Sequence, residues 1–193
     1  MTGTQASVGA TGTLDRMIGL LTARAAAVDH TEVGAVLDGI HDARRVFVTG
    51  AGRSGLVARA FANRLMHLGM SVHVVGEVTT PAIERGDALL VVSNSGSGGA
   101  VVHAARTAAA VGARVLAVTG VEAGPVREVA DRSVVLPLAV PAPASRREDA
   151  LDPPMGTVFE QLAFLVLEAA VLDLQKRLRV TEGEMRARHA NLE

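Results

Sequence analysis

The chain has 193 residues, 49% of them apolar, and a formal net charge of −1, which favours one domain with a sizeable core and argues against a nucleic-acid partner. It has no cysteine, which excludes disulfides and thiolate chemistry and fits a cytoplasmic location. No apolar run approaches the ~18–20 residues of a membrane span, and the first ten residues lack the pattern of a signal peptide, so no membrane partner is expected.

The N-terminal part of the chain predicts a disordered segment followed by two helices. Residues 1–12 are expected to be disordered. Residues 13–41 hold the helices, the first marked by Leu14, Ile18 and Leu21 at helical spacing. The second helix is expected to begin after Thr31, which would act as its N-cap residue.

Apolar runs then alternate with helical segments through residues 42–137. The runs predict strands at 45–49, 71–75, 88–92, 114–119 and 133–137. Helices are expected at 54–68 and 99–111, with a short helical turn after Pro125. Strands that are apolar on both faces and joined by crossovers form parallel sheets covered by helices. The fold class is therefore α/β, a three-layer α/β/α sandwich with a five-stranded parallel sheet of the flavodoxin-like type.

The C-terminal part predicts a loop, a long helix and a polar tail. Five of the seven prolines lie in residues 137–154, so 138–154 are expected to form a surface loop. The helix at 155–178 has an apolar stripe that either packs on the sheet or pairs with a second subunit. The stripe consists of Val158, Phe159, Leu162, Leu165, Val166 and Leu172. A single domain then spans residues 13–193.

Two turns rich in glycine and serine follow the first and third predicted strands. The first is GAGRSG at 50–55 and the second is SNSGSGG at 93–99. Each precedes a predicted helix, whose N-terminus presents free N–H groups and the positive end of the helix dipole. Parallel sheets bind ligands beyond the carboxyl ends of their strands. The two turns together therefore predict a site for a small phosphorylated ligand.

The first turn also matches the dinucleotide fingerprint G-x-G-x-x-G. Glu77 lies 22 residues beyond Gly55, near the place of a ribose-binding acid. A dinucleotide-dependent enzyme is therefore an alternative, although such a fold has no evident need for the second turn.

Four stretches of the chain resemble the sugar-isomerase (SIS) domain family and, within it, the 6-phospho-3-hexuloisomerases. They are GAGRSGLVARAFANRLMHLG (50–69), VVGEVTTPAI (74–83), PMGTVFEQ (154–161) and RHANLE (188–193). In this family the second loop usually reads S-G-S-G, then a polar residue, then Ser or Thr. This chain has Asn94 in place of the first glycine and lacks the last hydroxyl at Gly98, which Ser97 or the Gly98 N–H would replace.

The resemblance implies a cofactor-free isomerase, with no metal, that interconverts D-arabino-3-hexulose 6-phosphate and fructose 6-phosphate. It also implies a homo-oligomer, with a tetramer favoured. The residues expected to bind the phosphate or the sugar are Gly52, Arg53, Ser54, Ser93, Asn94, Ser95, Ser97, Gly98 and Thr80. Alternatives are another SIS isomerase or a non-catalytic phosphosugar sensor. Sensors of this domain usually carry an added DNA-binding module, for which the residues before the first strand leave little room.

The resemblance also implies two catalytic residues, Glu160 as the base and His189 as an acid or a substrate-orienting donor. From the residues alone, Thr157 and Glu160 also match a capping box, which would give Glu160 a structural role. Glu77 and Glu168 are weaker candidates for the base. Because His189 lies near the C-terminus, it acts either in the site of its own chain or in that of a neighbouring subunit.

The histidines at positions 67 and 73 lie in different predicted elements, so neither is expected to bind a metal. Thr79 and Thr80 follow the second strand, where they either reach sugar hydroxyls or cap the turn at Pro81.

Overall fold

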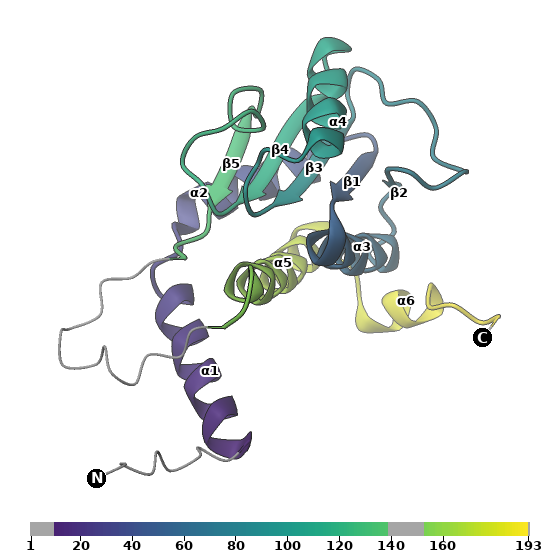
Figure 1. Cartoon of the computed structure of the whole chain (residues 1–193). Coiled ribbons are helices and arrows are strands. Elements are labelled where there is room, and N and C mark those ends of the chain that lie inside the picture. Colours follow the sequence, from purple (N-terminus) through teal and green to yellow (C-terminus); the bar gives the residue numbers. More distant parts are fainter. Residues whose placement is uncertain (1–9, 139–152, 193) are drawn as a thin grey trace, which may run out of the picture.

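The computed structural model describes residues 10–138 and 153–192, in which helices surround one sheet (Figure 1). In chain order the elements are α1 (Ala10–Ala25), α2 (His30–His41), β1 (Val46–Gly50), α3 (Gly52–His67), β2 (Val72–Val74), β3 (Ala88–Ser93), α4 (Gly99–Ala110), β4 (Arg114–Thr119), β5 (Arg132–Val135), α5 (Thr157–Leu178) and α6 (Glu182–Ala187). None of the helices in these residues is long and apolar enough to cross a membrane.

Five parallel strands form the sheet in the order β2-β1-β3-β4-β5. Each begins and ends within one or two residues of its predicted position. From β1 the chain moves outward to β2 and then returns to the other side of β1 to form β3. Ligand sites of such sheets lie at this reversal of strand order. The expected α/β class and flavodoxin-like arrangement are confirmed.

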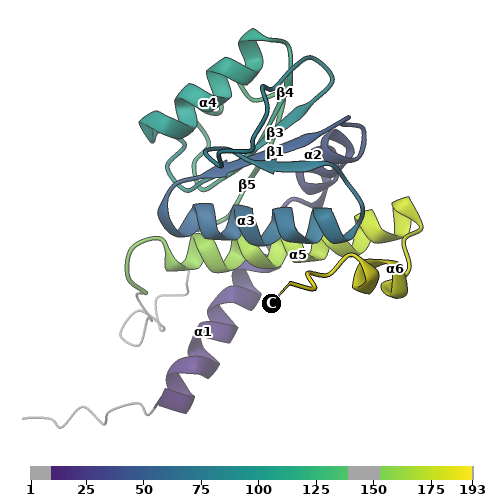
Figure 2. The ribbon, with the colours of Figure 1, turned by 90° about the vertical axis from the view of Figure 1, so that its right-hand side faces the viewer.

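Helices cover both faces of the sheet and complete three layers (Figure 2). Alternate residues of a strand point to opposite faces. Val46 and Val48 of β1 therefore pack with α2, α3 and α5, whereas Phe47 packs on the side of α4. Strands β1, β3 and β4 are mostly buried on both faces, so their runs are largely apolar, which is why they could be located in the sequence.

Two boundaries at the N-terminal end differ from the prediction. Helix α1 begins at Ala10, so residues 10–12 are helical rather than disordered, because each residue that extends an existing helix gains a hydrogen bond. Residues 1–9 lie outside the described part. The N-cap residue of α2 is Asp29, not Thr31: its carboxylate accepts hydrogen bonds from the N–H groups of Thr31 (2.7 Å) and Glu32 (3.2 Å).

The apolar stripe predicted on the long helix is only partly buried. Phe159 and Leu162 are in the core, but the side chains of Leu165 and Leu172 are 48% and 59% exposed. Ala163 and Ala170 are buried instead, because these small residues allow α5 to pack closely against its neighbours. Most of the loop expected at 138–154 lies outside the described residues, since only 138, 153 and 154 are described.

A buried carboxylate, that of Asp87, binds residues that precede β1 and β3 at the amino end of the sheet. Asp87, just before β3, accepts hydrogen bonds from Arg45 (2.6 and 3.1 Å), from Arg44 (3.2 Å) and from the N–H of Glu84 (2.9 Å). Burial by itself would raise the pKa of Asp87, but these hydrogen bonds and charges outweigh it and lower the pKa to about 2. The ionised form of Asp87 therefore stabilises the fold.

Replacing Asp87 with Asn should lower the free energy of unfolding at pH 7 by about 2–3 kcal/mol, because the charge that the two guanidinium groups bind is lost. Since the pKa is lower in the folded state, this contribution is present above the ordinary value near 3.8 and disappears as the pH falls toward 2. Urea unfolding at pH 7 and at pH 2.5 measures both effects.

The control is Glu84→Gln, which removes an exposed carboxylate that also pairs with Arg44. It should cost less than about 1 kcal/mol. Equal free energies of unfolding for the wild type and Asp87→Asn at pH 7 would contradict the stabilising role of ionised Asp87.

Candidate functional site

The two glycine- and serine-rich turns lie side by side at the carboxyl edge of the sheet. The first connects β1 to α3, and the second connects β3 to α4. Strands β1 and β3 are paired in parallel, with Gly50 opposite Val92. The register therefore brings the two turns together, as expected from the topology.

Two glycines of the first turn are required by close packing of the backbone. A Cβ at Gly50 would lie 2.8 Å from the carbonyl oxygen of Val92, and one at Gly55 would lie 2.6 Å from the carbonyl oxygen of Gly50. Gly52 differs, because it has a φ of +56° and open space where a Cβ would be. Its conformation is one that a residue without a side chain adopts most readily. The first turn is thus tight on its inner side and open at Gly52.

Three helices begin near these turns without a side-chain cap. The N-cap residues are Ala51 for α3, Gly98 for α4 and Gly156 for α5. In contrast, α2 and α6 are capped by Asp29 and Thr181. The N–H groups in the first turns of α3 and α4 are left without side-chain acceptors, so an anion can bind them.

The serines of the two turns offer further donors. Ser54 is buried, with 8% of its surface exposed, and its hydroxyl makes no hydrogen bond within the described chain. In the second turn, Ser93 accepts from the N–H of Gly96 (3.2 Å), and Ser95 accepts from the hydroxyl of Ser97 (3.0 Å). Ser93 and Ser95 thus order their own loop as acceptors while their hydroxyl hydrogens remain available to a ligand.

Glu160 faces the first turn from the start of α5. Its side chain is only 12% exposed, and its Oε2 accepts a hydrogen bond from Nε of Arg53. The capping-box interpretation of this glutamate is wrong, since Gly156, and not Thr157, is the N-cap residue. The hydroxyl of Thr157 instead donates to the carbonyl of Pro154 (2.5 Å). The capping box within the described residues of this C-terminal region is formed by Thr181 and Glu184.

Gly156 brings the second turn close to Glu160. A Cβ at Gly156 would lie 3.4 Å from Oε1 of Glu160 and 3.6 Å from Nδ2 of Asn94. Its φ of +72° is also one that other residues rarely adopt. The backbone carbonyl of Asn94 is held by the N–H of Gly120 (3.0 Å) at the end of β4. The carboxylate, the first turn and the second turn therefore converge.

The other candidate residues of the loop after β2 and of α5 have partners elsewhere. The hydroxyl of Thr80 donates to the carbonyl of Val74 (2.5 Å), which closes the loop that follows β2. Glu77 pairs with Arg59 at 2.5 Å, and Glu168 with Arg64 at 3.5 Å. Neither of these two carboxylates takes part in the ion pair between Glu160 and Arg53.

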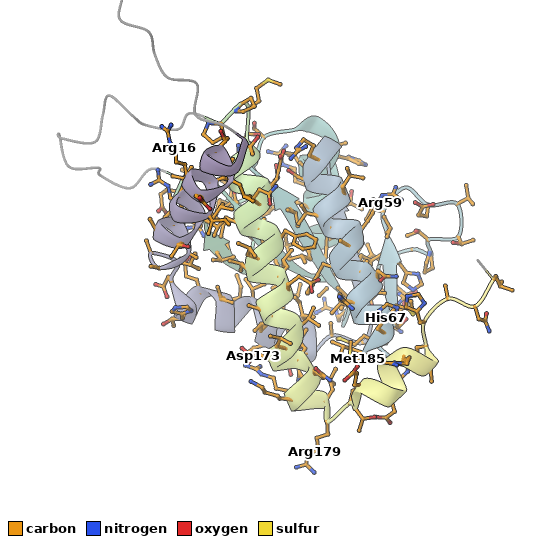
Figure 3. All side chains as sticks on the ribbon, turned by 90° about the horizontal axis from the view of Figure 1, so that it is seen from below. Arg16, Arg59, His67, Asp173, Arg179 and Met185 are labelled. Atoms are coloured by element: carbon orange, nitrogen blue, oxygen red, sulfur yellow. The ribbon has the colours of Figure 1, made fainter. Side chains whose placement is uncertain are left out.

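His189 lies at the opposite end of α3. Its ring stacks on His67, the last residue of α3, with centroids 5.3 Å apart and planes 15° from parallel. Arg188 also donates to the carbonyl of His67 (3.0 Å), and Figures 2 and 3 show α6 beside this end of the helix. At 1.5 Å per residue, about 20 Å separate His67 from Arg53 along α3. One chain therefore does not bring its own His189 to its own Glu160.

The two histidines at positions 67 and 73 each pack against another ring, His67 against His189 and His73 against Phe47. Burial and the nearby His189 and Arg64 lower the pKa of His67. The ring of His73 packs against Phe47, with centroids 5.1 Å apart. Within residues 10–138 and 153–192, no cluster of three or more histidine or acidic side chains could hold a metal ion.

The sequence pattern of the SIS domain matches residues 39–165, two thirds of the chain. The chain belongs to the SIS domain family. It is 45% identical over 172 residues to the 3-hexulose-6-phosphate isomerase of Mycobacterium gastri, covering 88% of this chain and 84% of that protein. With the 3-hexulose-6-phosphate isomerase of Bacillus subtilis it shares 35% identity over 169 residues, which cover 88% and 91% of the two chains.

A solved structure agrees with this membership. A hypothetical protein from Methanococcus jannaschii, whose crystal structure was described as inferring the function of a 3-hexulose-6-phosphate isomerase, matches with a TM-score of 0.77 and 34% identity. The match covers 93% of this SIS domain protein and 98% of the other chain. The resemblance carried by the four sequence stretches is thereby confirmed at the level of the family.

Sequence reasoning missed two features of this SIS domain site. It treated Arg53 as either a phosphate contact or a solvated side chain, whereas the structure pairs it with Glu160. It also overlooked Gly156, the N-cap residue of α5. The glycine just before Thr157 was a usable signal, because glycine is accepted as an N-cap residue and tolerates a positive φ.

Proposed function

We propose that this protein is an isomerase that interconverts D-arabino-3-hexulose 6-phosphate and fructose 6-phosphate without a cofactor. The observation that carries the proposal is the position of Glu160 beside two uncapped helix N-termini and their serine-rich turns. The relatives in M. gastri and B. subtilis are named 3-hexulose-6-phosphate isomerases, which supports 3-hexulose 6-phosphate as one of the two sugars. A phosphate bound at the turns would hold the sugar within reach of a carboxylate base.

The reaction moves a carbonyl from C3 to C2 of the sugar. Glu160 removes the proton from C2, the C–H electron pair forms a C2–C3 double bond, and the carbonyl electrons move to the oxygen on C3. Glu160 then returns the proton to C3 while the hydroxyl on C2 becomes the carbonyl, its proton passing to the oxygen on C3. No electrons are gained or lost overall, so the step requires no oxidant or reductant.

The phosphate site is proposed to consist of the N–H groups and hydroxyls of the two turns. The first turn contributes Gly52, Ser54 and the backbone N–H of Arg53, whose side chain pairs with Glu160, and the second turn contributes Ser93, Asn94, Ser95, Ser97 and Gly98. Thr80 remains a candidate contact only as an acceptor, since its hydroxyl hydrogen is used by Val74. Gly98 leaves the N-terminus of α4 without a side-chain cap, which supports its N–H groups as phosphate ligands.

The substitution Ser54→Ala tests the phosphate site directly. The Ser54 hydroxyl makes no hydrogen bond within the described residues, so the substitution breaks no internal bond there. Losing one hydrogen bond to a charged group costs about 1.5–3 kcal/mol, so the affinity for fructose 6-phosphate should fall roughly 10- to 150-fold. Isothermal titration calorimetry measures the change. The control Ser71→Ala, an exposed serine just before β2 at the other edge of the sheet, should bind as wild type does. Equal affinity of the wild type for fructose and fructose 6-phosphate would contradict the proposal.

A coupled assay that starts from the 3-hexulose phosphate and detects fructose 6-phosphate tests the function. The variant Glu160→Gln cannot accept the carbon-bound proton, so we expect its turnover to fall at least about 100-fold while fructose 6-phosphate still binds. Exchange of solvent deuterium into C2 and C3 should disappear as well.

The melting temperature serves as the control in this experiment. Because Glu160 caps no N–H group and its partner Arg53 is exposed, Glu160→Gln should unfold close to the wild-type temperature. Wild-type turnover in this variant would remove Glu160 from the mechanism. An inactive wild type that binds nicotinamide cofactors would instead favour the dinucleotide alternative.

Self-association is also part of the proposal, with a tetramer favoured by the family resemblance. Apolar side chains are exposed on two helices that contact each other, α1 and α5. They are Leu14, Ile18, Phe164, Leu165 and Leu172. Such a surface favours association with a second copy. The cytoplasmic location expected from the sequence likewise remains a proposal.

His189 is proposed to act in the site of a neighbouring subunit, which is consistent with its distance from Glu160 in one chain. His189→Ala should lower turnover sharply with little change in stability, because the ring is exposed. Mixing His189→Ala with Glu160→Gln should restore part of the activity, since some sites in mixed oligomers then contain both wild-type groups. Native mass spectrometry must show the mixed species. Full activity of His189→Ala would exclude the residue, and failure to complement in proven mixed oligomers would contradict sharing between subunits.

A further inference from the structure

The two oxygens of the Glu160 carboxylate have different surroundings. Oε2 accepts the hydrogen bond from Arg53. Oε1 has no hydrogen-bond partner among residues 10–138 and 153–192, and it lies 3.4 Å from the point where a Cβ of Gly156 would be. The same point is 3.6 Å from Nδ2 of Asn94, whose side chain likewise makes no hydrogen bond within these residues. An acceptor and a donor without partners in this part of the chain therefore lie near the same point beside Gly156.

Arg53 is well placed to fix this arrangement. It is the second residue of α3, and that helix is anchored by the backbone contact between Gly50 and Gly55. Arg53 donates its hydrogen bond to Glu160 through Nε, and the side chain of Arg53 is 61% exposed. Glu160, in contrast, is 12% exposed and reaches Arg53 from a different helix. The pair thus joins the starts of α3 and α5.

We propose that Arg53 is a positioning residue for Glu160, and that its main contribution is to turnover rather than to phosphate affinity. This inference rests on the proposed isomerase function. By holding Oε2, Arg53 leaves Oε1 as the atom that takes the proton from C2 and returns it to C3. Arg53 itself neither gives nor takes a proton. A carboxylate free to rotate would lose this alignment, and small displacements of a reacting group can cost about 100-fold in rate.

Three variants test the inference through kcat and through the affinity for fructose 6-phosphate measured by calorimetry. Arg53→Ala should lower kcat roughly 10- to 100-fold and change the dissociation constant less than about 3-fold. Millimolar guanidinium ion should restore part of the kcat, and Arg53→Lys should retain more activity than Arg53→Ala. The matched control is Arg59→Ala, which removes an arginine of the same helix that is about as exposed as Arg53 and pairs with Glu77 instead. The control should have wild-type kcat.

The double variant Arg53→Ala/Glu160→Gln separates this inference from the function on which it rests. If Arg53 acts through Glu160, the double variant should be no slower than Glu160→Gln alone, and guanidinium should not accelerate it. An unchanged kcat with an affinity loss of about 10-fold or more in Arg53→Ala would identify a phosphate ligand and overturn the inference. Full additivity in the double variant would also overturn it. Wild-type turnover in Glu160→Gln would instead contradict the proposed function, and the inference with it.

Discussion

The close backbone contact at the end of β1 is the constraint on which the site depends. The carbonyl of Gly50 and the backbone of Gly55 approach so closely that neither position has room for a Cβ. This contact directs α3 back across the sheet immediately after the strand. It also leaves the N–H groups at the start of α3 at the carboxyl edge, next to the end of β3. A larger residue at either position would force the strand and the helix apart and displace Arg53 and Ser54.

Side-chain caps are present on α2 and α6 and absent from α3, α4 and α5, which begin around the proposed ligand site. Asp29 and Thr181 satisfy the first N–H groups of α2 and α6, and a cap of this kind contributes about 1 kcal/mol to stability. Helices α3, α4 and α5 have no such side chain. The first N–H groups of these helices therefore have no side-chain acceptor in the free protein. A bound anion can supply the missing acceptors, so ligand binding should stabilise this edge of the sheet.

Helices α3 and α5 connect the candidate site to the region of the C-terminal tail. They lie side by side (Figure 2), with Arg53 and Glu160 paired near their starts and Arg64 and Glu168 paired farther along. The tail packs at the far end of α3, where His189 stacks on His67. Since α5 also exposes Phe164, Leu165 and Leu172, the helix that carries Glu160 has an exposed apolar surface that supports the proposed self-association. Catalysis and assembly are therefore proposed to involve the same helix.

The sequence by itself determined the strands, the two turns and the family. Buried parallel strands are apolar on both faces and glycines mark tight turns, so both signals are local and can be read from neighbouring residues. Only the tertiary structure decided the rest: that Glu160 pairs with Arg53 instead of capping its helix, that Leu165 and Leu172 are exposed, and that His189 lies about 20 Å from the site in its own chain. These features depend on contacts between residues far apart in the chain. The spacing of residues along one helix does not reveal which other helix faces them.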